Sequence, residues 1–136
     1  MTQSPAPALD PSGTTVAVLG GTGEQGRGLA RRLALAGCPV VLGSRDAARA
    51  AAAAEGLPGS VRGTDNATAA AEGDIVIVAV PWDGHRELLA SLAETLTGKV
   101  VVDCVNPLGF DKQGAYALPV EEGSAAQQAA AVLPGS

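Results

Sequence analysis

A glycine-rich turn, set between an apolar run and a helical pattern, constrains the fold of this 136-residue chain more than any other feature. The turn reads Gly21-Thr22-Gly23-Glu24-Gln25-Gly26, and the apolar run 15–19 comes directly before it. This is the G-x-G-x-x-G spacing of a dinucleotide-binding turn, in which the first glycine permits the tight turn and the second lets the backbone approach a pyrophosphate. The third lets helix and strand pack closely. A turn that serves packing alone is the alternative, and the absence of a Gly-Lys-Ser/Thr sequence at the required spacing excludes a Walker loop.

Strand and helix patterns alternate along the rest of the chain. We expect strands at 15–19, 39–43, around 60–62, 74–80 and 99–103, and helices at 25–36, 47–55, 66–72, 84–96 and 124–133. Continuous apolar strands that alternate with helices are typical of a parallel sheet covered on both faces. The sequence therefore predicts an α/β fold: a Rossmann-type, doubly wound parallel sheet of at least five strands in a three-layer α/β/α domain.

Length and composition limit the classes of function. Residues 1–13 are rich in Pro, Ser and Thr and are expected to form a flexible leader, so the single domain would span 14–136. With 9 Lys and Arg against 14 Asp and Glu, the net charge opposes binding to nucleic acid. No apolar run is long enough for a membrane helix and no signal peptide begins the chain, so we expect a cytoplasmic protein without a membrane partner.

The end of the second predicted strand indicates which dinucleotide binds. Domains that prefer NAD usually place an acidic residue there, whereas this chain has Gly43-Ser44-Arg45, with Arg49 four residues further on. A hydroxyl and a guanidinium group bind a 2′-phosphate through charge-assisted hydrogen bonds, and helical spacing puts Arg49 on the same face as Arg45. NADP(H) is the predicted cofactor, and a pair of solvated surface arginines is the alternative.

Other candidate residues follow later strands. Val80-Pro81-Trp82 and Asn106 come after the fourth and fifth predicted strands, at the edge where open α/β sheets bind ligands. Trp82 is interpreted either as flanking the ribose or nicotinamide or as a packing residue. His85, the only histidine, is expected to be solvated or to cap its helix rather than to act as an acid or base.

The two cysteines and the lack of clustered ligands limit the chemistry further. Cys38 and Cys104 are too few for a disulfide framework, lack zinc-site spacing and are interpreted as buried thiols. No spacing supports a dyad of Asp103 with Cys104. Neither a catalytic side chain nor a metal site is therefore assigned.

Four segments together resemble the NADPH-dependent reductases of coenzyme F420, which is an 8-hydroxy-5-deazaflavin. These segments are 18–26, 43–45, 80–82 and 102–107, and the likeness extends from residue 16 to residue 133. The resemblance implies direct hydride transfer between the nicotinamide and the deazaflavin, with coenzyme F420 as the second substrate. Such a reaction needs few acid–base groups, because the cofactors carry the chemistry and the protein aligns them.

The resemblance also implies roles for individual residues. Residues 22–25 would contact the pyrophosphate, Ser44, Arg45 and Arg49 would hold the 2′-phosphate, and residues 80–82 would border the nicotinamide. The full set of predicted cofactor-binding residues is Gly21, Thr22, Gly23, Glu24, Gln25, Gly26, Ser44, Arg45, Arg49, Val80, Pro81, Trp82 and Asn106.

Members of that family are longer, with a carboxyl-terminal part that completes the sheet and builds much of the deazaflavin pocket. We therefore expect this chain to be a fragment, a truncated product or an excised domain. Two other interpretations stay open: a non-catalytic NADP-binding module, and another NADP-dependent reductase with a similar amino-terminal domain, such as one that resembles pyrroline-5-carboxylate reductase. A homodimer is a further expectation.

Overall fold

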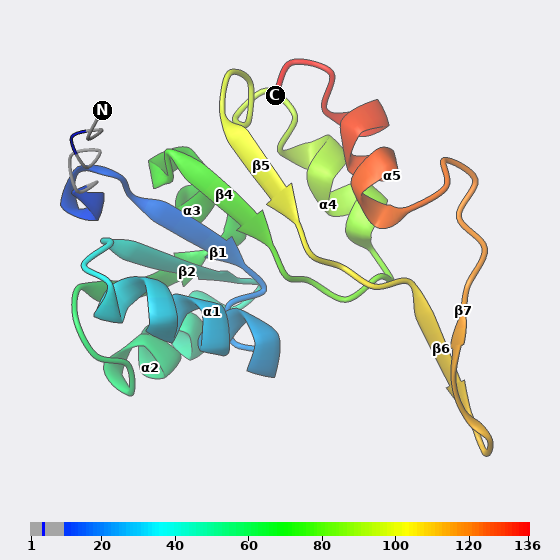
Figure 1. The fold of residues 1–136 in the computed structure, drawn as a ribbon, viewed down its shortest axis with the longest axis horizontal. Helices are drawn as coiled ribbons and strands as arrows, with labels where there is room; N and C mark the ends of the chain where they lie inside the picture. Colours follow the sequence, from blue (N-terminus) through cyan, green and yellow to red (C-terminus); the bar gives the residue numbers. More distant parts are fainter. Residues whose placement is uncertain (1–3, 5–9) are drawn as a thin grey trace.

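A parallel sheet of five strands forms the centre of the protein, whose computed structural model describes residue 4 and residues 10–136. The strand order is β3-β2-β1-β4-β5 (Figure 1). The strands are β1 (Val16–Leu19), β2 (Val40–Ser44), β3 (Val61–Asp65), β4 (Ile75–Val78) and β5 (Val100–Asp103). The order reverses between β1 and β4, and ligands of open α/β sheets bind at such a point, beyond the carboxyl ends of the strands. The predicted Rossmann-type sheet is confirmed.

Helices cover both faces of the sheet. One apolar cluster joins the sheet to α1 (Glu24–Leu35) and α2 (Ala47–Glu55). The second cluster, on the opposite face, joins it to α3 (Asn66–Glu72), α4 (His85–Ser91) and α5 (Ala125–Val132). The predicted three layers are therefore present.

Small side chains let α1 lie close to the sheet. Gly26, Ala30 and Ala34 are its buried residues, four apart along one face of the helix. The helix was expected to extend to residue 36, but Ala36 follows the last helical residue and is exposed. Gly37 then adopts a left-handed φ of 98°, a conformation that glycine adopts without strain.

Aspartate side chains begin the next two helices. Asp46 Oδ1 accepts hydrogen bonds from the backbone N–H groups of Ala48 and Arg49, so Asp46 is the N-cap of α2. Asp65 caps α3 in the same way, and the hydrogen bond from the Thr68 backbone, followed by that from its hydroxyl, lowers the pKa of the Asp65 carboxyl. The Asp65 cap therefore stabilises the fold above the ordinary pKa of aspartate, and this contribution is lost as the pH falls through the lowered value.

Three elements differ from their predictions by more than one residue at an end. β4 ends at Val78 rather than at residue 80. β3 runs to Asp65 rather than to residue 62, and it pairs with β2 along all five residues. The helix predicted at 84–96 ends at Ser91, because the N–H of Leu92 bonds to the carbonyl of Leu89 and tightens the last turn. Leu92 and Leu96 are nevertheless buried, since the following turns stay packed on the sheet.

An antiparallel hairpin after β5 was not predicted. It consists of β6 (Leu108–Asp111) and β7 (Gly114–Ala117), and Figure 1 shows it projecting away from the sheet. Its turn is stabilised by a hydrogen bond from the Gln113 N–H to Asp111 Oδ1 and by the left-handed φ of Gly114. Leu108 and Phe110 form an apolar face of this hairpin, and they are 41% and 74% exposed.

The outer strand β5 is less covered than expected. The predicted buried run contains Val100 and Val102, which are 61% and 45% exposed. Val101 between them packs against the cluster that includes α4 and α5. The expectation of a strand covered on both faces is therefore wrong for β5 among the described residues.

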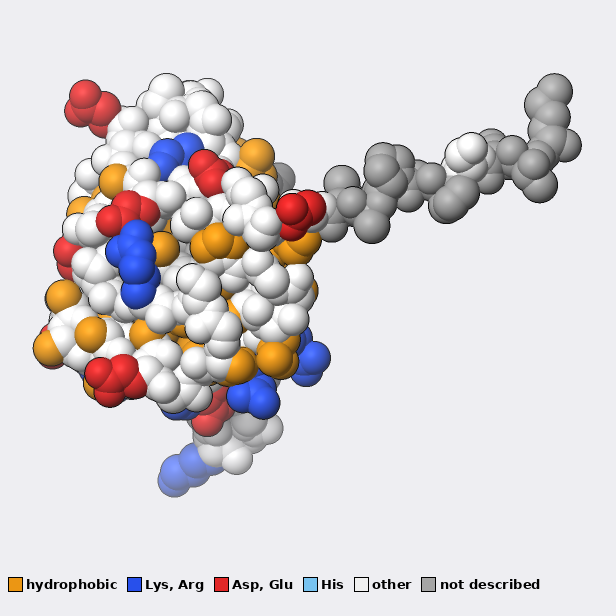
Figure 2. Space-filling view, turned by 90° about the vertical axis from the view of Figure 1, so that its left-hand side faces the viewer, with side chains coloured by type: hydrophobic (Ala, Val, Ile, Leu, Met, Phe, Trp, Pro, Cys, Tyr) orange, Lys and Arg blue, Asp and Glu red, His pale blue; other side chains and the backbone are white. Residues whose placement is uncertain are grey.

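The leader expected at 1–13 lies largely outside the described residues. Within its described part, Pro11–Gly13 forms a short 3₁₀ turn capped by the side chain of Asp10. Among residue 4 and residues 10–136, none of the helices combines the length and the apolar character that a membrane span needs. Figure 2 shows acidic and basic side chains interspersed on the side of the molecule that lies at the left of Figure 1.

Lys99 links the start of β5 to the end of α3. Its Nζ donates to the carbonyls of Ala70, Ala71 and Gly73 at distances of 2.7–2.8 Å. A cation there donates hydrogen bonds to carbonyl groups that have no partner within the helix, and it interacts favourably with the negative end of the helix dipole. We expect Lys99→Met to lower the free energy of unfolding by about 1–2 kcal/mol, measured by urea denaturation. The same change at the exposed Lys112 of the hairpin turn serves as control, and equal losses in both variants would contradict the role given to Lys99.

Candidate functional site

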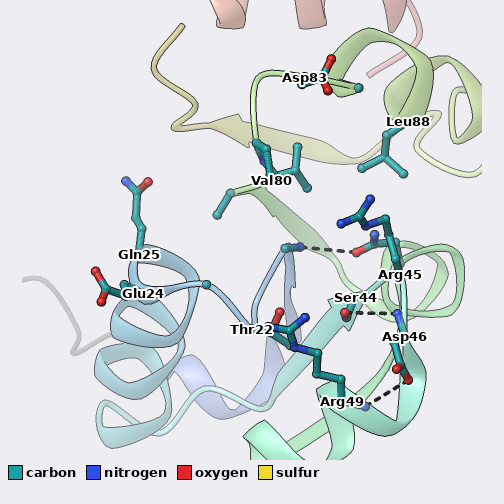
Figure 3. A pocket seen from close by; sticks show the side chains of 16 residues that line it. Thr22, Glu24, Gln25, Ser44, Arg45, Asp46, Arg49, Val80, Asp83 and Leu88 are labelled. Atoms are coloured by element: carbon teal, nitrogen blue, oxygen red, sulfur yellow. Dashed lines mark hydrogen bonds between the residues drawn. The ribbon is translucent and has the colours of Figure 1, made fainter. Parts of the chain in front are cut away.

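A pocket of about 600 Å³ opens at the carboxyl ends of β1, β2 and β4 (Figure 3). It lies at the reversal of strand order, where the fold positions ligands. Four segments contribute its lining: the glycine turn, the start of α2, the start of α3, and the stretch from the end of β4 into α4. The lining residues are Gly20, Thr22, Gly23, Glu24, Gln25, Ser44, Arg45, Asp46, Arg49, Asn66, Ala79, Val80, Pro81, Asp83, Gly84 and Leu88.

The glycine turn is shaped by backbone packing that a side chain would disrupt. Gly20 has a left-handed φ of 73°, and a Cβ atom on it would lie 2.5 Å from the carbonyl oxygen of Ala79. A Cβ on Gly26 would lie 2.8 Å from both the carbonyl oxygen of Gly20 and the Cα of Gly21. Gly21 also donates its N–H to the carbonyl of Gly43, which ties the turn to β2. The start of α1 is thus held against the ends of two strands.

The amino terminus of α1 faces the pocket without a side-chain cap. Gly23 is the N-cap residue, and no side chain of residue 4 or residues 10–136 accepts a hydrogen bond from the first turn of this 12-residue helix. A Cβ on Gly23 would have the Gly20 oxygen at 3.5 Å as its nearest neighbour, so backbone groups are accessible here. In Figure 3 the side chains of Glu24 and Gln25 point away from the two arginines. Free N–H groups and the positive end of the dipole suit the site to a phosphate or another anion.

The opposite side of the pocket carries Ser44, Arg45 and Arg49. Ser44 is 7% exposed, and its Oγ accepts a hydrogen bond from the Asp46 N–H, so the hydroxyl hydrogen is free to donate to a ligand. Figure 3 shows Arg49 reaching from α2 toward Thr22, and Arg45 extending toward the side that carries Val80 and Leu88. Two exposed guanidinium groups on one pocket suit it to a second anionic group.

The pocket brings together nine of the thirteen predicted cofactor-binding residues. Gly21 and Gly26 instead shape the turn from behind, as their backbone contacts indicate. Trp82 and Asn106 are not part of the lining. Their predicted contacts with the cofactor stay predictions.

Seven lining residues were not predicted as ligands: Gly20, Asp46, Asn66, Ala79, Asp83, Gly84 and Leu88. Asn66 is the most informative of them, because its Oδ1 accepts a hydrogen bond of 3.4 Å from the N–H of Gly20 in the glycine turn. The signal that identifies Asn66 is its position directly after a strand, at the ligand edge of the sheet. The prediction missed it because the third strand was placed too early.

The expectation that His85 is solvated or caps its helix is wrong. The imidazole is completely buried, with Nε2 2.5 Å from Asp103 Oδ2 and Nδ1 2.9 Å from Gln128 Oε1. Both partners are distant in sequence, 18 and 43 residues away. The Asp103 carboxylate pairs with His85 and not with the Cys104 thiol, so these two neighbours form no dyad.

Cys104 is partly buried, whereas Cys38 is buried as expected. The Sγ of Cys104 donates to the carbonyl of Val78 at 3.1 Å. Burial, followed by the negative charge of Asp103, raises the pKa of the Cys104 thiol. The thiolate that reacts with alkylating agents is therefore scarcer than in a free cysteine.

We expect Cys104 in a Cys38→Ala variant to react with iodoacetamide several-fold more slowly than cysteine in a short peptide at about pH 7.5. The rate should continue to rise at pH values where that of the peptide has levelled off. Mass spectrometry gives the extent of alkylation, and the urea-unfolded variant supplies the control, in which the rates should become equal. Equal rates in the folded protein would mean that the thiol is not suppressed.

Sequence comparison relates the chain to proteins named as reductases. Residues 15–107 match the profile of the family described as NADP oxidoreductase coenzyme F420-dependent. A relative from Methanothermobacter marburgensis, named F420-dependent NADP reductase, is 42% identical over 127 residues. The match covers 87% of this chain and 57% of that protein, so the chain spans little more than half the length of this relative.

Solved structures share the architecture. An Arthrobacter sp. FB24 protein, assigned as an F420-dependent NADP reductase, is 33% identical with a TM-score of 0.76, covering 90% of this chain and 59% of that one. A pyrroline-5-carboxylate reductase from Coxiella burnetii has a TM-score of 0.59 at 20% identity, with 69% of this chain and 36% of that one covered. The second likeness concerns the fold alone.

Proposed function

The chain belongs to the family of coenzyme F420-dependent NADP oxidoreductases, and we propose that its pocket binds NADP(H) for hydride transfer to or from coenzyme F420. The observation that carries this proposal is the pairing of two anion sites across one pocket. The uncapped start of α1 suits the pyrophosphate, and Arg45 and Arg49 suit the 2′-phosphate of the adenosine half.

The side chains that contact the cofactor form part of the same proposal. Residues 22–25 would hold the pyrophosphate largely through backbone groups, and the Ser44 hydroxyl would join the two arginines at the 2′-phosphate. Residues 80–82 and Asn106 follow strands that end at this edge, so the nicotinamide would lie toward them. The bound nicotinamide would give or accept the hydride, and the residues at this edge would orient it.

Hydride exchange with the deazaflavin requires a second site. The chain spans 57% of the Methanothermobacter relative, and we propose that the full reductase activity depends on protein corresponding to the rest of that length. A non-catalytic NADP-binding module is the second candidate, because the chain spans little more than half of the Methanothermobacter relative. No specific observation favours a reductase of the pyrroline-5-carboxylate type.

Mixing the protein with NADPH and oxidised coenzyme F420 distinguishes these candidates. A reductase should bleach the visible absorbance of the deazaflavin while the near-ultraviolet absorbance of NADPH falls in equal molar amount. A binding module should bind NADPH with micromolar affinity in calorimetry but leave both absorbances unchanged. Failure to bind NADPH would overturn both candidates.

Further parts of the proposal concern partners and location. We propose a homodimer, supported by the exposed apolar face of the β6–β7 hairpin, which is a solvated two-stranded element of a kind that is marginally stable alone. Sedimentation as a monomer at about 100 μM would contradict it. We also propose a cytoplasmic location and no nucleic-acid partner, in keeping with small-molecule cofactors and a net charge of -5.

A further inference from the structure

A chain of buried polar side chains connects α5 to the wall of the pocket. Its centre is His85, the first residue of α4, which contacts Asp103 at the end of β5 and Gln128 in α5. The Asp103 side chain is 3% exposed, and Gln128 is likewise buried. Figure 1 shows α4 and α5 side by side, so the chain crosses between two helices and the sheet.

The hydrogen bonds fix the orientation of each member. The Gln128 amide nitrogen donates to Glu122 Oε2 at 3.3 Å, which turns the amide oxygen toward Nδ1 of His85. Glu122 in turn pairs with Arg86. Both ring nitrogens of His85 therefore face oxygen atoms of the protein, and the imidazole is held in one rotamer without help from solvent.

His85 stands directly behind one wall of the pocket. Pro81, Asp83 and Gly84 immediately before it, and Leu88 one turn later, all line the cavity. Trp82 is not part of the cavity lining and packs on His85 instead. Its ring centroid is 5.2 Å from that of His85, and the two ring planes are inclined by 36°. The backbone N–H of His85 also donates to the carbonyl of Trp82, so ring and backbone hold the same turn.

Apolar packing of Leu89 also holds α4, but the turn before the helix has little fixation of its own. Gly84 is the N-cap of α4 with a left-handed φ of 85°, and no side chain caps the helix there. A seven-residue helix with an uncapped start contributes little rigidity by itself. The two side-chain contacts of His85 therefore add to the packing of Leu89 in fixing the position of the pocket wall.

We propose that His85 is a positioning residue, which Asp103 and Gln128 hold so that the wall formed by Pro81, Asp83, Gly84 and Leu88 has the shape that binds the nucleotide. This inference rests on the proposed binding of NADP(H) in the pocket. It also extends the binding unit beyond the family match at residues 15–107, because Gln128 belongs to α5. None of the three polar residues lines the cavity, so their effect on the ligand is transmitted through the wall.

Gln128→Leu tests the proposal, because leucine fills a similar volume and removes the acceptor for His85 Nδ1. Trp82 is the only tryptophan, so its fluorescence reports on the turn without interference. We expect the variant to shift the emission maximum, to increase quenching of Trp82 by acrylamide, and to raise the Kd for NADPH roughly 3- to 10-fold in calorimetry. Gln127→Leu, an exposed position on the same helix, should change neither the fluorescence nor the Kd.

The outcomes separate positioning from a purely structural contact. A lower melting temperature with unchanged Trp82 emission, quenching and NADPH affinity would overturn the proposal. If the unmodified chain does not bind NADPH, the proposed function fails, whereas the fluorescence comparison still decides whether Gln128 controls the turn. If Gln128→Leu does not fold, Glu122→Ala removes the carboxylate that orients Gln128 and is judged by the same two readouts.

Discussion

Replacing Gly63 with alanine is expected to lower the free energy of unfolding by about 2–4 kcal/mol, the largest loss from the addition of one methyl group that we predict in this protein. Gly63 is the middle residue of β3, and a Cβ atom there would lie 2.1 Å from both the carbonyl carbon and the oxygen of Ala50. Both atoms belong to the backbone of α2, so no side-chain rotation relieves the overlap. The helix must move away from the strand and give up its close packing.

Urea denaturation of Gly63→Ala and the unmodified chain measures this loss. Gly28→Ala is the matched control, since Gly28 is an exposed residue of α1, and in the described part of the chain an added Cβ would meet no atom within 4 Å apart from its chain neighbours and the backbone of its own helix. Alanine there should raise the stability by about 0.5–1 kcal/mol, because it restricts the unfolded chain and favours the helix. If Gly63→Ala were as stable as the unmodified protein, the close contact of α2 with β3 would be incorrect.

The double change Arg45→Ala with Arg49→Ala is expected to weaken NADPH binding by roughly two to four orders of magnitude. This range follows from about 1.5–3 kcal/mol for each hydrogen bond to a charged group, because the double change removes one such bond at each position. Both side chains are exposed, so the fold should persist in the variant. NADH lacks the 2′-phosphate, and its affinity should change by less than about threefold.

Calorimetric titration of the double variant with each nucleotide measures the two effects. A double change of Arg27 and Arg31 to alanine provides the control, because it removes two exposed arginines of α1 that do not line the pocket. An equal loss of NADPH affinity in both double variants would indicate general electrostatic attraction. Retention of NADPH affinity by the Arg45 and Arg49 variant would mean that the 2′-phosphate binds elsewhere.

The central part of the fold was predictable because its sequence signals are local. The strands β1, β2 and β4 are continuous apolar runs, and α2 and α3 have the predicted bounds. The glycine turn also identifies the position of the pocket, and a Cβ atom on Gly21 or Gly26 would overlap neighbouring atoms. Signals of this kind lie within a short stretch of sequence and can be read without knowledge of tertiary contacts.

Other features depend on contacts between distant segments and could not be read in this way. Gly63 admits the backbone of α2 against β3, and the partner in this contact is not adjacent in sequence. His85 looked solvated because both of its partners are far away in sequence. The hairpin was missed because its strands are short and rich in glycine, and the turn signal Asp111-Lys112-Gln113-Gly114 had no long apolar runs around it.

Trp82 illustrates a limit of a different kind. Its position after β4 was inferred correctly, but a strand end specifies only a place at the sheet edge and not the direction of the side chain. The ring packs on His85, behind the wall formed by Pro81, Asp83 and Gly84. The imidazole that it contacts is itself held by Gln128 of α5, and no local pattern contains that information.

Titration of the unmodified chain with NADPH and with NADH, side by side in the same buffer, tests the proposed cofactor most directly. If Arg45 and Arg49 bind the 2′-phosphate opposite the start of α1, NADPH should bind with a Kd in the micromolar range and NADH at least about 100-fold more weakly. Equal affinities for the two nucleotides, or no binding of NADPH at millimolar concentration, would contradict the assignment of this pocket to NADP(H).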